Sequence, residues 1–349
     1  MRPGVEGAAA SLEDKVAALR SPLAYAERPK VIRAIETHFA WVFLTDDHAF
    51  KLKKPMRTAY LDLSGVAARR YNCSEELRLN QRLAQGIYLD VVPLTMAADG
   101  ALRVGGDGIV VDWLVKMRRL PSALMLDRAI VAGVVPAAPL AAVGRLLARF
   151  YRAQPSIAFD PRDYVARIRS QMEQDRSDLR APGLGLTPGL VEAVAAAHTV
   201  ACFRLEAELM LRARERRIIE GHGDLRPEHI CLTEPPCVID ALEFSLDLRT
   251  LDPGEELAFL SVECERLGDV RPADTVLREY RTESGDPISR RLLDFYRSRR
   301  ATVRAKLVAW HLKDPAYSGR GDWRVQAERY LERARVYAQG ASDEAAQCG

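Results

Sequence analysis

The chain has 349 residues, which at roughly 150 residues per domain predicts two domains or one large two-lobed unit. Hydrophobic residues make up 48% of the sequence and charged residues 28%, so there is ample apolar material for a core and a disordered chain is excluded. The 51 lysines and arginines and the 48 acidic residues give a net charge of +3, and no long basic block concentrates the excess. This balance argues against a nucleic-acid binder.

The sequence shows no membrane-spanning segment. Its longest apolar stretch, 129–144, is interrupted by Pro136 and Pro139 and is too short to cross a bilayer. Residues 1–15 contain no apolar run long enough for a secretory signal. Six cysteines are scattered without a CxxC pair, which indicates neither a zinc site nor a disulfide framework. We therefore expect reduced thiols, a cytoplasmic location and no membrane partner.

Short strands and helices are mixed in the first third of the chain. The expected elements are a helix over 12–19 with Ser11 as its cap, strands over 41–44 and 49–53, a helix over 72–84 and a strand over 110–117. Side chains alternate between the two faces of a strand, so Lys51 and Lys53 share one face. In the helix, Glu76 lies on the same side as Leu79 and Leu83.

From about residue 118 the chain is mostly helical. Helical periodicity covers 141–151, 164–179, 188–216, 290–312 and 323–338. One strand-rich island, 218–244, interrupts the helices. Neither an internal repeat nor a GxxxxGKS or GxxxxGKT phosphate-binding loop occurs in the sequence.

The island carries the residues that indicate chemistry. It contains the triplet HGD at 222–224 and two short apolar runs on either side of the Pro-rich turn 233–236. This spacing predicts a β-hairpin in which His229 faces Asp240, with Cβ atoms about 5 Å apart. A loop carboxylate, Asp224, beside two facing metal-ligand side chains suits phosphoryl transfer. Taken singly, each residue is more often structural, as a turn, a cap or a polar strand end, but their combination favours a site.

These motifs resemble the catalytic and metal-binding loops of the protein-kinase-like fold, in the form found in aminoglycoside phosphotransferases and choline kinases. The resemblance rests on HGD at 222–224, on Ile239-Asp240, and on DPGEELA at 252–258, which is similar to Asp-Pro-x-x-Asp-Leu-Ala. In the first third, segments 37–44, 49–55 and 75–80 resemble a group of uncharacterised bacterial proteins described as aminoglycoside phosphotransferase family enzymes. Together these segments cover most of residues 30–265.

The resemblance implies an α+β, two-lobe fold. A small mixed β-sheet and a helix would form the N-terminal lobe, residues 1–117. A mainly helical C-terminal lobe, residues 118–340, would carry the catalytic and metal-binding loops, and a polar tail would follow at 341–349.

The resemblance also implies roles for the matching residues. Asp224 corresponds to the catalytic-loop aspartate, which accepts or orients the proton of the acceptor hydroxyl. Lys51 corresponds to the lysine that binds ATP phosphates, and Asp240 to the aspartate that holds the metal. Glu76, or its neighbour Glu75, corresponds to the helix glutamate that holds the lysine.

Further positions follow from the same resemblance. Thr37 and His38 lie in the loop expected over the phosphates, and the segment from Val115 to Met117 is the expected hinge beside adenine. For Lys53 and Lys54, a solvated strand edge is favoured over phosphate binding. The residues expected to support the site are His222, Glu228, Glu243, Asp252 and Glu256. For Glu243, three residues beyond Asp240, a supporting or metal-binding role and a surface position both stay open.

Three departures from the family pattern affect the expected chemistry. His229 stands where the second metal ligand is usually asparagine, and imidazole suits manganese or other transition ions better than magnesium. The second metal would then be absent, be manganese, or use Glu228. The loop 36–40 lacks glycine, so Thr37 and His38 would have to contact phosphate through their side chains and backbone. Glu256 replaces the usual aspartate, which alters the support of the catalytic loop.

Three functions stay open at this point. The leading one is an ATP-dependent phosphotransferase that acts on a small-molecule hydroxyl with Mg²⁺ or Mn²⁺, with Lys51, Asp224 and Asp240 converging on one triphosphate. The second is a catalytically weak, nucleotide-binding regulator. The third is a metal-dependent hydrolase built on His222, Asp224, His229 and Asp240, which leaves Lys51 without a role and therefore ranks last.

Overall fold

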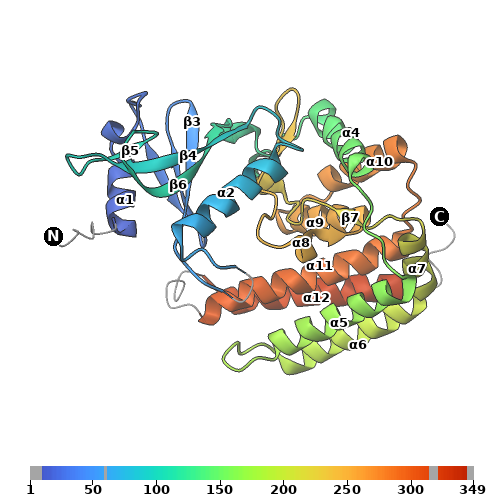
Figure 1. Cartoon of the computed structure of the whole chain (residues 1–349). Coiled ribbons are helices and arrows are strands. Elements are labelled where there is room, and N and C mark those ends of the chain that lie inside the picture. Colours follow the sequence, from blue (N-terminus) through green and yellow to red (C-terminus); the bar gives the residue numbers. More distant parts are fainter. Residues whose placement is uncertain (1–9, 59–60, 314–320, 344–349) are drawn as a thin grey trace. The chain divides into compact units, whose positions relative to one another are not determined.

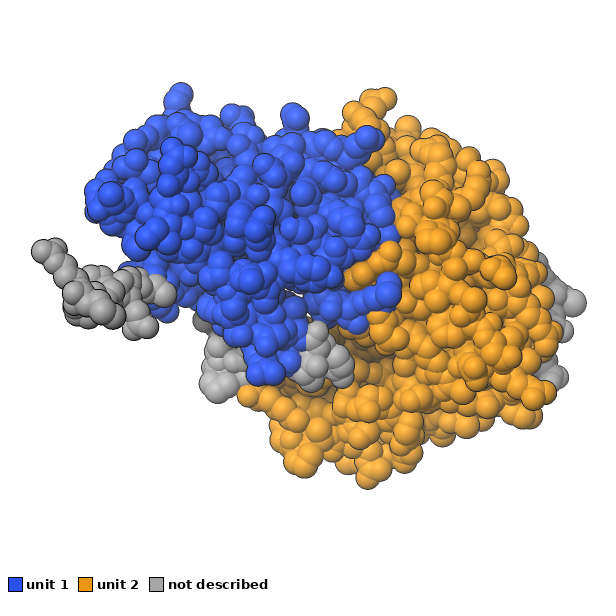
Figure 2. Space-filling model, viewed as in Figure 1, with its two compact units in different colours: residues 1–124, 237–246 blue, residues 125–236, 247–349 orange. Residues whose placement is uncertain are grey.

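A computed structural model describes residues 10–58, 61–313 and 321–343 of the chain. The chain divides into two compact units, which Figure 2 colours separately. Unit 1 is Met1–Leu124 with Cys237–Leu246, and unit 2 is Met125–Pro236 with Asp247–Gly349.

This division differs from the predicted lobes in two respects. The change from the first unit to the second falls after Leu124 instead of after residue 117. Residues Cys237–Leu246, which include Asp240, group with unit 1, whereas the prediction assigns them to the helical lobe. Of the predicted tail, 344–349 lie outside the described residues, as does Cys348.

Unit 1 is built around a six-stranded sheet (Figure 1). Its strands are β1 Arg33–Glu36, β2 Ala40–Leu44, β3 His48–Lys53, β4 Tyr88–Met96, β5 Leu102–Val104 and β6 Ile109–Arg118. The spatial order is β1-β2-β3-β6-β4-β5. Every described pairing in this sheet is antiparallel, so the expectation of a mixed sheet is wrong. The three predicted strands are confirmed, each with ends shifted by no more than one residue.

The pleat of β3 determines which side chains enter the core of unit 1. Phe50 and Leu52 are buried in a cluster with Phe43 of β2 and Leu114 of β6. Because side chains alternate along a strand, Lys51 and Lys53 point to the opposite face of the sheet.

Two helices accompany the sheet. α1, Leu12–Leu19, has its predicted bounds and cap: the Ser11 hydroxyl accepts from the Asp14 N–H, and the Asp14 carboxylate accepts from the Ser11 N–H. α2, Val66–Asn80, begins six residues before the predicted start. The reason is Arg69, which lies buried against both carboxylate oxygens of Asp112 on β6, at 2.8 and 2.9 Å. A charged side chain thus fills a core position, which hydrophobic periodicity does not reveal.

Unit 2 is mainly helical (Figure 1). Its helices of six or more residues are α3 Leu126–Val131, α4 Ala137–Ala153, α5 Pro161–Leu179, α6 Pro188–Arg204, α7 Glu206–Arg214, α9 Pro253–Arg266, α10 Arg271–Ser284, α11 Arg290–Trp310 and α12 Trp323–Ser342. The predicted helix 188–216 is two helices, because Leu205 leaves the helical conformation with φ −97° and ψ 4°. α9 escaped prediction because nearly all its residues are buried, so it shows no polar face.

The short strands of the island also form. β7 is Ile219–Glu220, β8 is Ile230–Cys231 and β9 is Cys237–Val238, and a 3₁₀ turn covers Pro227–His229. β8 belongs to unit 2 and β9 to unit 1. His229 likewise belongs to unit 2 and Asp240 to unit 1, so their facing stays a prediction.

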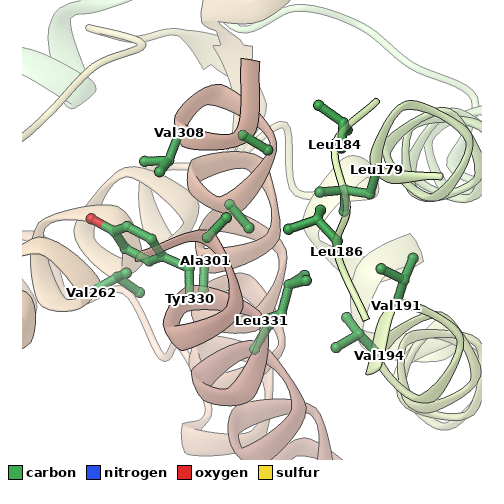
Figure 3. Close-up of a cluster of buried hydrophobic side chains, with 14 residues drawn as sticks. Leu179, Leu184, Leu186, Val191, Val194, Val262, Ala301, Val308, Tyr330 and Leu331 are labelled. Carbon is green, nitrogen blue, oxygen red and sulfur yellow. The ribbon is translucent and has the colours of Figure 1, made fainter. Parts of the chain in front are cut away.

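A buried cluster of small and branched side chains holds the long helices of unit 2 together (Figure 3). Ala301 and Val308 of α11 meet Tyr330 and Leu331 of α12, and Val194 of α6 packs against them. α11 runs along α12, and α6 packs against α12 as well. Within the described part of the chain, no helix has both the length and the apolar character needed to cross a membrane.

Truncation of Leu331, which is fully buried in this cluster, tests its contribution. We expect Leu331→Ala to lower the free energy of unfolding by about 2–5 kcal/mol, through lost apolar burial and the cavity left behind. Val336→Ala on the same helix is the control, since Val336 is exposed and its truncation should cost about 0.5 kcal/mol or less. Chemical denaturation measures both, and equal losses would contradict the packing described.

A buried histidine makes stability depend on pH. His198 of α6 lies with Nε2 2.7 Å from the Ser298 hydroxyl, which donates to the Ala334 carbonyl, so Nε2 of the imidazole is the donor. Burial, with Arg299 nearby, lowers the pKa of His198 to about 3. In the unfolded chain the pKa is about 6.5, so between these values only the unfolded state binds the proton.

Stability should therefore fall as the pH drops below about 6.5. Between pH 6.5 and 5 the loss attributable to His198 should be about 2 kcal/mol, at about 1.4 kcal/mol per pH unit. The His198→Gln variant, which cannot titrate, should lose correspondingly less between pH 7 and 5. Urea denaturation of both proteins at the two pH values measures this difference, and parallel losses would refute it.

Candidate active site

Lys51 lies at the centre of the charged groups of unit 1. Its Nζ is 2.9 Å from Glu76 Oε1 on α2 and 2.7 Å from Asp240 Oδ1. Of the two glutamates left open by the sequence, the partner is thus Glu76, whereas Glu75 pairs with Arg78 at 2.7 Å. The predicted Lys51–Glu76 and Lys51–Asp240 groupings are both present within unit 1.

Burial and charge oppose each other at these groups. Burial would lower the pKa of Lys51, but the carboxylates of Asp240 and Glu76 hold it well above its usual value. Burial would likewise raise the pKa of Glu76, and the two ammonium groups of Lys51 and Lys53 hold it low instead. Lys51 and Glu76 are therefore charged at neutral pH, and the lysine is kept in one position.

The segment around Asp240 is fixed to α2 and β4 by its backbone. The Asp240 N–H donates to the Tyr88 hydroxyl at 3.1 Å, and the Ala241 N–H donates to Asn80 Oδ1 at 2.9 Å. Asp240 itself has φ +62°, a left-handed conformation that aspartate adopts more readily than most residues. These contacts explain why Cys237–Leu246 groups with unit 1.

Lys53 has a different place from the one expected. It is 2% exposed, so the predicted solvated strand edge is wrong for this residue. Its Nζ lies 2.5 Å from Glu76 Oε2 and 2.6 Å from Glu243 Oε1. The alternation along β3 that aligned Lys51 with Lys53 was the signal for this arrangement. Lys54 does lie nearer the surface, beside Glu36.

Asp224 belongs to unit 2, in the loop between β7 and the turn Pro227–His229. Its Oδ2 is 3.1 Å from Arg226 Nη2 and 3.6 Å from His229 Nδ1. Burial would raise the pKa of Asp224, but Arg226, His229 and Arg304 outweigh it and hold the pKa below its usual value. Arg226 and Arg304 were not foreseen, although Arg226 stands only two residues from the aspartate.

His229 uses both ring nitrogens in the described arrangement. Arg226 Nη2 lies 3.1 Å from Nε2, and since arginine only donates, Nε2 is an acceptor. Nδ1 then carries the proton and donates to the Asp224 carbonyl at 2.8 Å. A metal on Nε2 would have to displace this arginine, so His229 does not fit the second-metal role. Glu228, the other option, forms an ion pair with Arg266.

The backbone of the catalytic loop is held by Glu256. Glu256 Oε1 accepts from the Gly223 N–H, and burial raises the pKa of the Glu256 carboxyl despite this hydrogen bond and a second one from the His222 backbone. A Cβ on Gly221 would lie only 2.8 Å from the Glu256 carboxylate carbon, so glycine is needed there. The glutamate that departs from the family pattern therefore still supports the loop, with His222 fully buried beside it.

Asp252 supports the site from the first turn of α9. It caps the helix by accepting from the Gly254 N–H at 2.7 Å. Arg212 of α7 donates to both of its oxygens, at 2.6 and 2.8 Å, and also contacts Asp286. This is a scaffolding role, which fixes the start of the helix that carries Glu256.

The loop between β1 and β2 is a tight turn closed by Thr37. The Thr37 hydroxyl donates to the Ala40 carbonyl at 2.9 Å and accepts from the Ala40 N–H at 3.0 Å. The turn thus uses the side chain that was expected to contact phosphate. His38 is exposed at the tip, stacked edge-on against Phe39.

Val115 and Met117 lie inside β6. Val115 is flanked by Lys51 on β3 and Val91 on β4, and Met117 by Ala49 and Tyr88. The ladder therefore uses the backbone of both residues, and the strand continues to Arg118. Their place beside adenine stays a prediction.

Few ligands for a metal ion come together in the described residues. In the described residues, no group of three or more histidine, cysteine, aspartate or glutamate side chains could hold one. Asp240 offers what Mg²⁺ prefers, a carboxylate that is 41% exposed. It could serve as one protein ligand, with the remaining ligands supplied by substrate phosphates and water.

The antiparallel sheet of unit 1 and the helices of unit 2 are similar in fold to those of choline kinases. A choline/ethanolamine kinase family protein from Mesorhizobium loti aligns with a TM-score of 0.57 at 16% identity, over 94% of this chain and 99% of that one. A choline kinase from Cryptosporidium parvum aligns with a TM-score of 0.54 at 9% identity, over 95% and 97%. The predicted resemblance in fold is confirmed.

The similarity in sequence is to uncharacterised proteins. One from Mycobacterium bovis and one from Mycobacterium tuberculosis are each 32% identical to this chain over 312 residues, or 88% of it. The chain spans about 60% of the length of these relatives. No protein-family model matches the chain.

The close approach of Gly221 to Glu256 can be tested by substitution. We expect Gly221→Ala to destabilise the protein by about 1–3 kcal/mol, because the methyl group overlaps a buried carboxylate that cannot move freely. Adding Glu256→Asp, which shortens the acid by one methylene, should recover part of the loss. Thermal unfolding measures both variants.

Gly189→Ala is the matched control, since nothing lies within 4 Å of the methyl it would add. If Gly221→Ala is as stable as Gly189→Ala, the contact with Glu256 does not constrain the loop.

Proposed function

We propose that this protein is an ATP-dependent phosphotransferase that moves the γ-phosphoryl group of ATP to a hydroxyl of a small-molecule acceptor. The observation that carries the proposal is Lys51, ion-paired to both Glu76 and Asp240 on the sheet of a fold shared with choline kinases. A buried ammonium group held by two carboxylates is a fixed positive charge, which is what the phosphates of ATP require.

The proposed reaction assigns separate tasks to the two units. In unit 1, Lys51 binds phosphate oxygens and Glu76 keeps its ammonium group in place. Asp240 would hold a divalent cation, Mg²⁺ or Mn²⁺, and this cation would neutralise part of the phosphate charge. The phosphates then lie in a defined orientation, so that little further chemistry is needed from the protein.

In unit 2, Asp224 accepts a hydrogen bond from the acceptor hydroxyl and aims its oxygen at the γ-phosphorus. The new bond joins this oxygen to phosphorus, the bond to the ADP oxygen breaks, and the hydroxyl proton leaves toward Asp224. Arg226 and Arg304 keep the aspartate ionised before the reaction. The Glu256 contact with the Gly223 backbone fixes the loop that presents it.

Replacing Asp224 tests the assignment. Asp224→Asn keeps the shape of the side chain but removes the charge that orients the hydroxyl, so ATP-dependent turnover should fall by roughly 10²–10⁴-fold while the melting temperature changes little. The assay is ADP formation with a panel of hydroxyl-bearing metabolites, in Mg²⁺ and in Mn²⁺.

Asp269→Asn is the control, because Asp269 is also paired with an arginine, Arg271, but takes no part in the site. Turnover of Asp224→Asn at the level of this control would refute the role of Asp224.

A second function is favoured by the loop between β1 and β2. The hydroxyl of Thr37 closes the turn, so it is not available to bind phosphate. Weak nucleotide binding without catalysis would fit such a loop. A nucleotide-dependent thermal shift without ADP formation across the panel would favour this regulator. The hydrolase alternative gains no support from the described residues, which contain no cluster of metal ligands.

A further inference from the structure

Each of the two lysines of β3 bridges the same pair of structural elements. Lys51 joins Glu76 of α2 to Asp240, at 2.9 and 2.7 Å. Lys53 joins Glu76 to Glu243, three residues further along the same segment, at 2.5 and 2.6 Å. The two oxygens of Glu76 are thus divided between the lysines.

The two bridges differ in their access to solvent. Lys51 is 14% exposed and its partner Asp240 is 41% exposed, so a ligand can reach this bridge. Lys53 is 2% exposed and Glu243 13%, so the second bridge is shielded. Burial would lower the pKa of Lys53, but Glu76 and Glu243 raise it, so the lysine stays charged inside the unit.

Because of these differences, we expect nucleotide binding to break one bridge and leave the other intact. On the proposed function, phosphates and a metal ion compete for Lys51 and Asp240, and their mutual ion pair is then given up. Lys51 then shares its charge between phosphate and Glu76, so the fully buried carboxylate of Glu76 is compensated less completely. The shielded ammonium group of Lys53 remains on its second oxygen.

We infer that Lys53 is a positioning residue, which holds Glu76 and the segment Cys237–Leu246 in place through Glu243 while Lys51 exchanges Asp240 for phosphate. The inference rests on the proposed function for the exchange, but the link itself exists without nucleotide. An aromatic contact supports the same segment, since Phe244 lies with its ring centroid 6.0 Å from that of Phe39.

The link between Lys53 and Glu243 can be tested without an activity assay. Amide hydrogen exchange of peptides covering 237–246 is recorded in the nucleotide-free protein for wild type, Lys53→Met and Glu243→Gln. Loss of either partner should speed exchange in this segment by roughly tenfold or more, and the double variant should add little to Lys53→Met because both act through one contact. Lys54→Met is the control, since Lys54 pairs with the exposed Glu36 and should leave the segment unchanged.

Kinetics then test the positioning role. Glu243→Gln should lower kcat by roughly tenfold and change KM for ATP by less, because Lys51 is still present to bind phosphate but its surroundings are less ordered. A change in KM alone would contradict this, as would unchanged exchange at 237–246 in both single variants or fully additive effects in the double variant. If Lys53→Met does not fold, Glu243→Gln still tests the positioning role, because in that variant Lys53 remains paired with Glu76.

The outcomes separate this inference from the proposed function. Faster exchange at 237–246, in a protein that consumes no ATP with any acceptor, would support the link and reject the phosphotransferase. If the variants show unchanged exchange at 237–246 and the wild-type enzyme is active, the Lys53–Glu243 link is rejected and the phosphotransferase is not.

Discussion

The site of unit 1 depends on one constraint, which is that the ammonium group of Lys51 is largely buried and must be surrounded by opposite charge. The structure meets this need with carboxylates from two distant parts of the sequence, Glu76 on α2 and Asp240 on the segment beyond β9. An unpaired charge in this position would be strongly destabilising, so the fold of unit 1 and the arrangement of its charged groups are specified together. The helix, the sheet and the returning segment each supply one part.

Local patterns were sufficient to predict much of this arrangement. The alternation of β3 placed Phe50 and Leu52 in the core and the lysines on the other face, as found. Helical spacing put Glu76 on the buried side of α2, and the cap at Ser11 set the start of α1 correctly. These features could be predicted because each depends on residues within one element and on a regular period.

The features that escaped prediction depend on long-range pairing. Arg69 is buried because Asp112 meets it from β6, so the start of α2 looks polar in sequence although Arg69 faces the core. Lys53 looks like a surface lysine until Glu243, 190 residues away, approaches it. The hydroxyl of Thr37 was expected to be available to a ligand, but its own turn consumes it. In each case the interaction partner, and not the residue type, determines where the side chain lies and what it contacts.

The membership of Cys237–Leu246 in unit 1 has a consequence for how the protein can be divided. The chain leaves unit 1 after Leu124, returns for ten residues and leaves again after Leu246. Val238 and Ala241 of that return are buried, so a fragment ending at Leu124 would expose the surface they cover and would lack the acid that neutralises Lys51. The first unit is therefore no autonomous module that could be excised or exchanged between proteins by joining sequence end to end. Gene fusion or shuffling would conserve it only by carrying the intervening helices along.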